Sequence, residues 1–143
     1  MSFLLDTCVL SELVAKRPHP GVVGWIDGAD PDEVYLSVVT IGEIQEGIEK
    51  LRDPGRREKL ESWLRDDLLV RFRDRIALLD VGDLLEWGTL AGRLEAQGTT
   101  MPALDSLLAA TALHRRLVVV TRNEEDFRRS GVQLLNPWEN ESG

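Results

Sequence analysis

The sequence predicts an α/β fold, a three-layer α/β/α sandwich with a mostly parallel central sheet, formed by a single domain over residues 1–143. Two observations support this prediction. Short apolar segments rich in β-branched residues alternate with stretches of helical periodicity, and several of these helical stretches come in pairs. Acidic residues recur where a strand gives way to a helix. The carboxyl ends of parallel strands meet at one edge of a sheet, which is where such folds bind ligands.

Five segments have the composition of strands. Phe3-Leu4-Leu5 is a short apolar run that ends at Asp6, and the run of valines before Thr121 is the clearest strand in the chain. The expected strands cover residues 3–5, 34–39, 76–79, 117–120 and 132–135.

Helices are expected between these strands, because apolar residues there recur at intervals of three and four. Pro54 and Pro102 are suited to the first turn of a helix, and Gly98 to a position just beyond a helix end. The expected helices cover residues 10–14, 22–26, 41–51, 54–68, 84–97, 102–115 and 124–129.

Composition restricts the class of protein. The formal net charge is −8, so strong binding of nucleic acid through backbone contacts alone is not expected. Acidity of this kind serves solubility, and part of it can also be gathered in a metal site. Cys8 is the single cysteine, which excludes an intrachain disulfide and suits a reducing compartment. With no signal peptide and no membrane span expected, we predict a cytoplasmic protein.

Asp105 is the most informative acid. It is the one acidic residue between Gly98 and Asn123, and Leu108, Ala109 and Ala112 share its helix face. A carboxylate on such a face needs a partner. Its ordinary explanation is an acid in a first helical turn, where the helix dipole favours negative charge.

Other acids have equally plain structural explanations. Thr40 and Glu43 fit a capping box, although Glu43 can also point past the strand end into a cleft. Asp6 ends the first strand and can cap the next helix. Asn123 can be a cap with Asp126 in the first turn, or either residue can supply an oxygen ligand to a metal. Caps are the preferred reading for the following two acids: Asp80 and Asp83.

Other catalytic chemistries lack essential residues. His19 and His114 have no partners at zinc-ligand spacing, and the sequence has no phosphate-binding glycine loop and no serine elbow. An aspartyl phosphatase in its commonest form needs an acid two residues after the first Asp, where this chain has Cys8. We expect Cys8 to be an inert, small packing residue.

Four motifs and a C-terminal tail together resemble PIN-domain ribonucleases, especially the toxins of VapBC-type toxin–antitoxin pairs. Residues 5–13 resemble the opening motif, and the following segments resemble the other motifs and the tail: 40–44, 101–112, 120–127 and 135–138. The resemblance covers nearly the whole chain. It implies a PIN-like fold and a Mg²⁺ or Mn²⁺ ion held by Asp6, Glu43, Asp105 and a residue of the fourth motif, with Thr7 positioning the metal or its water.

This resemblance implies an endoribonuclease that cleaves RNA by a metal-activated water, since Mg²⁺ prefers oxygen ligands and neutralises phosphate charge. It also implies a homodimer and a small antitoxin that masks the site. Asn123 stands where many relatives have Asp, which leaves open whether Asn123 or Asp126 completes the site, and whether one or two metals act. The alternative is a catalytically degenerate PIN fold that works only by binding an antitoxin or another protein.

Overall fold

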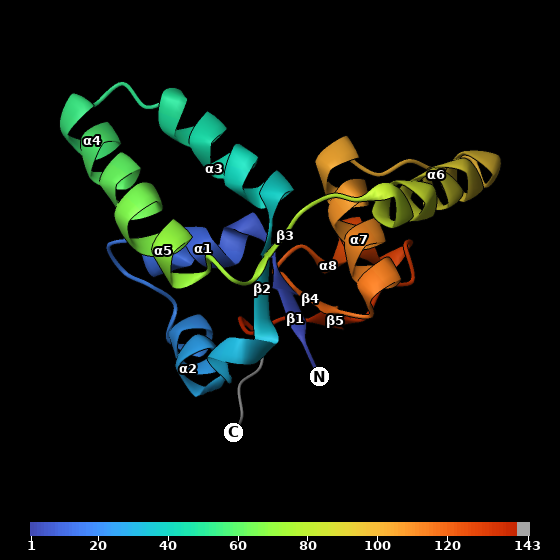
Figure 1. The fold of residues 1–143 in the computed structure, drawn as a ribbon, viewed down its shortest axis with the longest axis horizontal. Coiled ribbons are helices and arrows are strands. Elements are labelled where there is room, and N and C mark those ends of the chain that lie inside the picture. The colour runs from blue at the N-terminus through green and yellow to red at the C-terminus, as the bar shows by residue number, and fades with distance from the viewer. Residues whose placement is uncertain (140–143) are drawn as a thin grey trace.

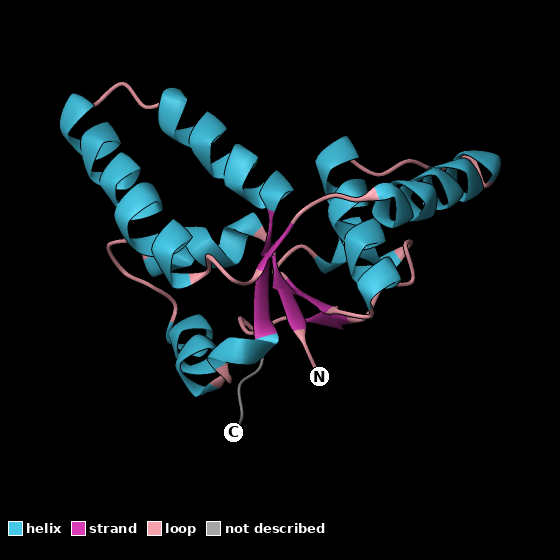
Figure 2. Ribbon diagram, viewed as in Figure 1, coloured by secondary structure: helices cyan, strands magenta, loops and turns pink. Residues whose placement is uncertain are grey.

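A five-stranded, all-parallel sheet lies between two groups of helices in the computed structural model, which describes residues 1–139 (Figures 1 and 2). The strand order is β3-β2-β1-β4-β5. Their bounds are β1 Phe3–Leu5, β2 Val34–Ser37, β3 Ile76–Ala77, β4 Val118–Val120 and β5 Leu134–Leu135. The α/β sandwich expected from the sequence is confirmed, and its sheet is parallel throughout. The expectation of a single domain also includes residues 140–143, which lie outside the described residues.

One group of helices covers one face of the sheet. It consists of α1 Thr7–Leu13, α2 Pro20–Gly28, the 3-10 turn η1 Pro31–Glu33, α3 Val38–Glu49, α4 Pro54–Ser62, the π-helical η2 Trp63–Leu68 and α5 Leu69–Arg71. The other face carries α6 Val81–Ala96, α7 Ala103–Arg115 and α8 Glu124–Arg128. Figure 1 shows the two groups on opposite sides of the strands.

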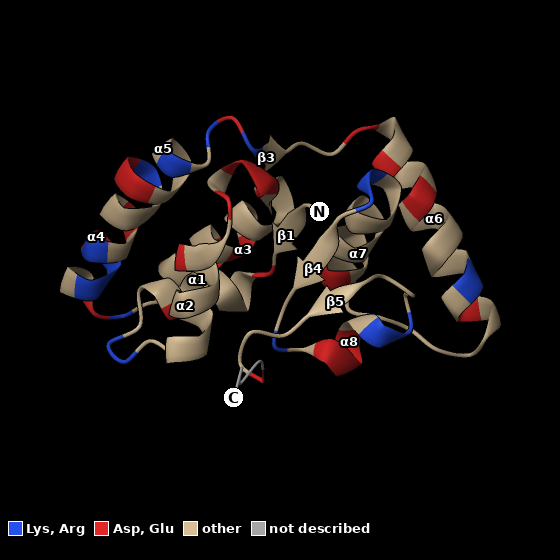
Figure 3. Cartoon of the chain, turned by 90° about the horizontal axis from the view of Figure 1, so that it is seen from below, with Lys and Arg blue, Asp and Glu red and all other residues tan. Residues whose placement is uncertain are grey.

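Strand periodicity explains the two layers of core. Leu4 and Val119 are fully buried against α6 and α7, whereas Leu5 and Val120 are fully buried against the helices of the other face. Side chains alternate across a strand, so each central strand contributes to both cores. Charged residues are spread over the outer surfaces, for example along α4 and α6 (Figure 3).

The strand expected over residues 34–39 is shorter than predicted. β2 ends at Ser37, whose hydroxyl accepts a hydrogen bond from the Val39 amide at 3.0 Å, and α3 begins at Val38. The capping-box reading of Thr40 and Glu43 is therefore wrong, because both residues lie inside α3. The β-branched pair Val38-Val39 favours a strand by propensity, but the Ser37 cap starts the helix before it.

The remaining boundaries differ mainly at strand ends. The expected strands at 76–79 and 132–135 are two residues long in the structure, and the one at 117–120 begins at Val118. Residues 54–68 form continuous helix as expected, with a π-helical second half. Among the described residues, no helix has both the length and the apolar character needed to cross a membrane.

Candidate functional site

The predicted site lies where the strand order reverses. β1 has β2 on one side and β4 on the other, so the chain leaves these three strands in different directions at their carboxyl ends. In parallel α/β sheets this reversal opens a crevice that binds ligands. Asp6 follows β1 directly, Thr121 follows β4, and α3 begins where β2 ends.

Asp6 is a buried carboxylate that accepts three hydrogen bonds, one of them from the Cys8 thiol to Oδ2 at 3.7 Å. The Thr7 amide donates to Oδ1 at 2.8 Å, and the Thr121 hydroxyl donates to Oδ2 at 2.8 Å. The residue is 4% exposed, so these donors replace much of the lost hydration. Asp6 is the N-cap of α1, and this capping role also fixes its carboxylate at the crevice.

Glu43 projects from the second turn of α3 toward the same place. Its Oε1 accepts a hydrogen bond from the Thr7 hydroxyl at 3.0 Å. Burial, together with the negative charges of Asp6 and Glu46, raises the pKa of Glu43 despite the bond from Thr7. Thr7 thus connects two acids: its amide binds Asp6 and its hydroxyl binds Glu43.

Asp105 comes from the first turn of α7, on the other face of the sheet. Burial raises its pKa from 3.8 to about 6, and the charges of Asp6, Asp126 and Glu43 act in the same direction. The Asp105 carboxyl group is therefore close enough to the carboxyl groups of Asp6, Glu43 and Asp126 to interact with them electrostatically. Leu108, Ala109 and Ala112 are buried, which confirms the apolar face predicted for this helix.

The fourth motif forms the short helix α8. Asn123 is its N-cap residue but its side chain makes no capping bond, and Asp126 lies in the first turn. Asp126 acts electrostatically on Asp105, as described above. Both side chains are exposed and line an open hollow of about 500 Å³.

The four acids approach one another without forming a tight cluster. Within residues 1–139, the one group of three acidic or histidine ligands whose atoms all lie within 4.8 Å is Asp80, Asp83 and His114. Like charges at the crevice repel, which accounts for the wider spacing of the predicted acids.

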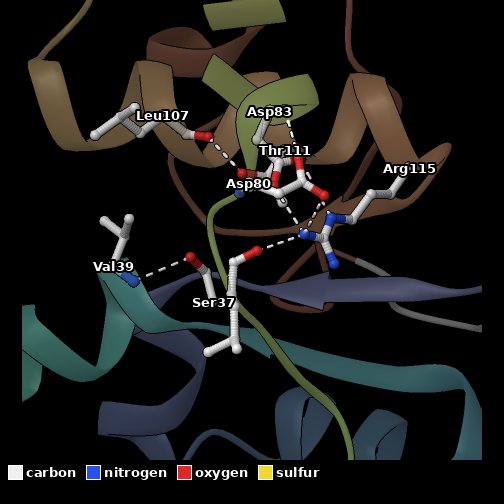
Figure 4. A network of polar contacts seen from close by, with 8 residues as sticks. Ser37, Val39, Asp80, Asp83, Leu107, Thr111 and Arg115 are labelled. Atoms are coloured by element: carbon white, nitrogen blue, oxygen red, sulfur yellow. Dashed lines mark hydrogen bonds and ion pairs between the residues drawn. The ribbon is translucent and has the colours of Figure 1, made fainter. Parts of the chain in front are cut away.

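Asp80 and Asp83 form a structural cluster at the start of α6. The two residues make a reciprocal capping box, which confirms the caps predicted from sequence. Arg115 binds the fully buried Asp83 through two nitrogens, at 3.2 and 2.7 Å (Figure 4). Although burial opposes it, the hydrogen bonds from Arg115 and the Asp80 backbone hold the pKa of Asp83 below its usual range. The carboxylates of Asp80 and Asp83 are therefore already used in helix capping and in the ion pair with Arg115.

The arrangement around Asp6 suits a hard divalent cation. Its donors are carboxylate oxygens with a nearby hydroxyl, and Mg²⁺ and Mn²⁺ prefer such oxygen ligands. Burial raises the pKa values of Asp105 and Glu43, and the neighbouring negative charges add to this effect; a bound cation would oppose it by favouring the ionised carboxylates. Asp6, Glu43, Asp105 and Asp126 are the residues that would hold such a cation.

Thr121 is a residue of the candidate site that sequence reasoning did not single out. Its hydroxyl is fully buried, donates to Asp6 and accepts from the Asn123 amide at 2.9 Å. The sequence feature that could have identified Thr121 is its position as a hydroxyl residue directly after the clearest strand. Burial and the neighbouring Asp6 charge raise the pKa of the Cys8 thiol, which agrees with the inert packing residue expected from the sequence.

Comparison with known proteins agrees with this geometry. The model of the PIN domain family matches residues 3–132. The chain belongs to the PIN domain family. This PIN domain is 32% identical to toxin FitB of Neisseria gonorrhoeae, over 94% of the chain and 97% of the relative. It is 29% identical to a VapC ribonuclease of Sinorhizobium fredii, over 95% and 97% of the two proteins.

Solved structures agree on the fold. A FitAB complex bound to an IR36 DNA fragment matches with a TM-score of 0.90 and 30% identity, covering 97% of each chain. The resemblance noted from the sequence motifs is thus confirmed, and this PIN domain is a nuclease of the VapC type.

Proposed function

We propose that this PIN domain is a Mg²⁺- or Mn²⁺-dependent endoribonuclease and the toxin of a toxin–antitoxin pair. The observation that carries the proposal is the electrostatic coupling of Asp105 to Asp6, Glu43 and Asp126, which come from four separate segments of the chain. The names of the relatives, a toxin and a VapC ribonuclease, support the choice of RNA and of the biological role.

Each site residue has a distinct task in this proposal. Asp6, fixed by Thr7 and Thr121, provides the best-positioned carboxylate for a metal. Glu43 and Asp105 would hold the ion together with Asp6, and Thr7 orients Glu43 through its hydroxyl. A divalent cation bound to these residues would lower the pKa of a water ligand and neutralise charge on the phosphate. The carboxylates of the crevice would be the groups that accept a proton from water.

Asp126 rather than Asn123 completes the site in this proposal. The charge of Asp126 already acts on Asp105, and a carboxylate binds Mg²⁺ more strongly than a carboxamide. Asp126→Asn should therefore weaken cleavage more than Asn123→Ala does. Equal loss in the two variants would favour a shared role for both side chains.

The direct test is cleavage of labelled single-stranded RNA by the purified chain. Cleavage should require Mg²⁺ or Mn²⁺, stop when the metal is chelated, and fall by at least about a hundredfold in Asp6→Asn. Asp27→Asn is a matched control, because it makes the same change on the exposed surface of α2. Cleavage that survives both chelation and Asp6→Asn would refute the metal mechanism.

A binding module without catalysis is the second candidate function. Two observations favour it: Asn123 stands at the fourth motif, and Asp126 is exposed on a helix of five residues. Titration with Mn²⁺ separates the two candidates. If the chain binds no Mn²⁺ through Asp6, the non-catalytic binding module is supported. If it binds Mn²⁺ stoichiometrically and Asp6→Asn removes this binding, the enzyme is supported.

We also propose a cytoplasmic homodimer that is inhibited by a small antitoxin, as the family resemblance implies. Leu78, Val81 and Leu85 are 66%, 76% and 69% exposed around the start of α6, and a second copy would cover such a surface. Light scattering should give twice the 16.0 kDa mass of one chain. Leu85→Glu should yield the monomer, and a dimer unaffected by it would place the interface elsewhere.

A further inference from the structure

Arg122 stands between the acidic crevice and the open hollow beside α8. Its side chain lines this hollow of about 500 Å³ together with Asp126, which also acts on Asp105. The hollow therefore shares one acid, Asp126, with the candidate site. A polynucleotide with one phosphate at that site would have its neighbouring phosphate close to this surface.

The backbone of Arg122 is fixed relative to Asp6. Thr121, the preceding residue, donates its hydroxyl hydrogen bond to Asp6 at 2.8 Å. The Arg122 amide itself contacts the sulfur of Cys8 at 3.5 Å, and Cys8 lies two residues after Asp6. These contacts join the end of β4 to the start of α1, so the guanidinium starts from a defined position at the rim of the crevice.

Trp138 provides a platform for the guanidinium. The Arg122 guanidinium carbon lies 5.8 Å from the centre of the Trp138 ring, which is a cation–π distance. The ring is held in place by Asn136, whose side chain accepts from the Trp138 amide at 3.0 Å and donates to Glu124 at 3.1 Å. Trp138 also packs against the buried core, and the His19 ring lies 6.4 Å from it.

The charge of Arg122 is available to a ligand. Arg128, the other cation of the hollow, forms an ion pair with Glu125. No such ion pair joins Arg122 to an acid of residues 1–139, and its side chain is exposed. A cation–π contact with the ring restricts where the guanidinium lies, and the planar fork of guanidinium nitrogen donors matches the paired oxygens of a phosphate.

We propose that Arg122 binds the RNA phosphate next to the scissile one, and that Trp138 positions the guanidinium for this contact. This inference rests on the proposed ribonuclease function and gives it a substrate-positioning residue. It also explains how an acidic chain holds RNA: one fixed cation beside the metal site supplies a local phosphate contact that the overall charge of −8 does not.

The test compares cleavage of labelled single-stranded RNA by Arg122→Ala and by the wild type, both loaded with Mn²⁺. We expect KM to rise about tenfold with little change in kcat, because a uniform binding contact is lost. The slope of log KM against log salt should fall by about one phosphate contact. Arg122→Lys should recover part of the loss, since it keeps the charge without the planar fork of donors.

Controls separate phosphate binding from structural damage. Arg129→Ala changes the net charge equally, but that side chain is bonded to Thr99 and should leave KM unchanged. The affinity for Mn²⁺ should be unchanged or higher in Arg122→Ala, because the substitution removes a positive charge that repels the cation. Trp138→Phe should stay near the wild type, whereas Trp138→Leu should raise KM, and both should be compared at matched thermal stability.

Two failures are distinguishable. If the wild type cleaves RNA and Arg122→Ala has the same KM and the same salt slope, the inference about Arg122 is wrong and the proposed function stands. If the wild type shows no metal-dependent cleavage, the proposed function fails and this inference fails with it. A normal KM in Arg122→Ala combined with loss of inhibition by the antitoxin would assign Arg122 to the protein partner instead.

Discussion

Burial and neighbouring negative charges together raise the pKa of Asp105 to about 6. Its raised pKa means that the folded state binds a proton more tightly than the unfolded chain does. The free energy of unfolding therefore falls as the pH rises from about 4 to about 6, and the loss is complete above that range. This is the reverse of the usual carboxylate, whose ionised form is the one that the fold stabilises.

We expect Asp105→Asn to be more stable than the wild type at pH 8 in the absence of divalent cations. The gain should be about 1 kcal/mol, because solvent screens a half-exposed carboxyl and reduces the effect. Thermal unfolding at pH 8 and pH 4 measures it, and the gap should nearly vanish at pH 4. An equal gap at both pH values would show that packing rather than charge is responsible, and Asp27→Asn provides the baseline.

Thr121 offers a second test at this scale. Thr121→Val removes the hydroxyl that donates to buried Asp6 while keeping the shape of the side chain. We expect a loss of about 1–3 kcal/mol, because the carboxylate is left short of a donor. Urea unfolding gives the value, and Thr121→Ser should restore most of it. A neutral Thr121→Val would mean that water replaces the hydroxyl.

At the scale of elements, the start of α3 shows how two local signals compete. Residues 34–39 have strand propensity throughout, yet Ser37 caps a helix that begins at Val38. The capping places Glu43 one turn deeper in the helix than a capping box would, with its side chain at Thr7. The position of this candidate site acid therefore depends on a cap three residues before Thr40, outside the segment that suggested Glu43.

Because α3 is capped by Ser37 and not by Thr40, we expect the loss of these two hydroxyl groups to have different effects on the free energy of unfolding. Ser37→Ala should cost about 1 kcal/mol through loss of the cap. Thr40→Val should be neutral or stabilising, because the buried Thr40 hydroxyl has no hydrogen-bond partner among residues 1–139. The two free energies of unfolding, measured in urea, decide the point. A costly Thr40→Val would indicate that its hydroxyl has a ligand or water partner.

Periodicity was sufficient to predict the layers of the fold, and the motifs named the four acids that we propose for the site. They could not identify the hydrogen bond from Thr121 to Asp6 or the one from the Arg122 amide to Cys8, because those contacts depend on β4 pairing beside β1 across more than a hundred residues. They also could not exclude Asp80 and Asp83 as ligands by geometry. That required the ion pair with Arg115, which comes from the far end of α7.

For the whole molecule, the two layers of helices meet at the crevice. Asp6 and Glu43 belong to the elements of one face, and Asp105 and Asp126 to helices of the other. Repulsion between these acids acts against closing the two halves, and a shared cation would reverse it. Stability of the entire fold should therefore depend on the metal.

We expect Mn²⁺ at a hundred times its Kd to stabilise the wild type by about 2.7 kcal/mol, or about 10 °C in Tm. The effect should weaken below pH 6, since a proton on Asp105 competes with the ion. Calorimetry of the wild type and Asp6→Asn at pH 8 and pH 5 measures both dependences. Because Asp6→Asn removes a ligand without removing the other acids, its Tm should respond little to Mn²⁺ at either pH. An equal response in both proteins would locate the bound ion away from the crevice, for example at Asp80, and would separate cation binding from the proposed chemistry.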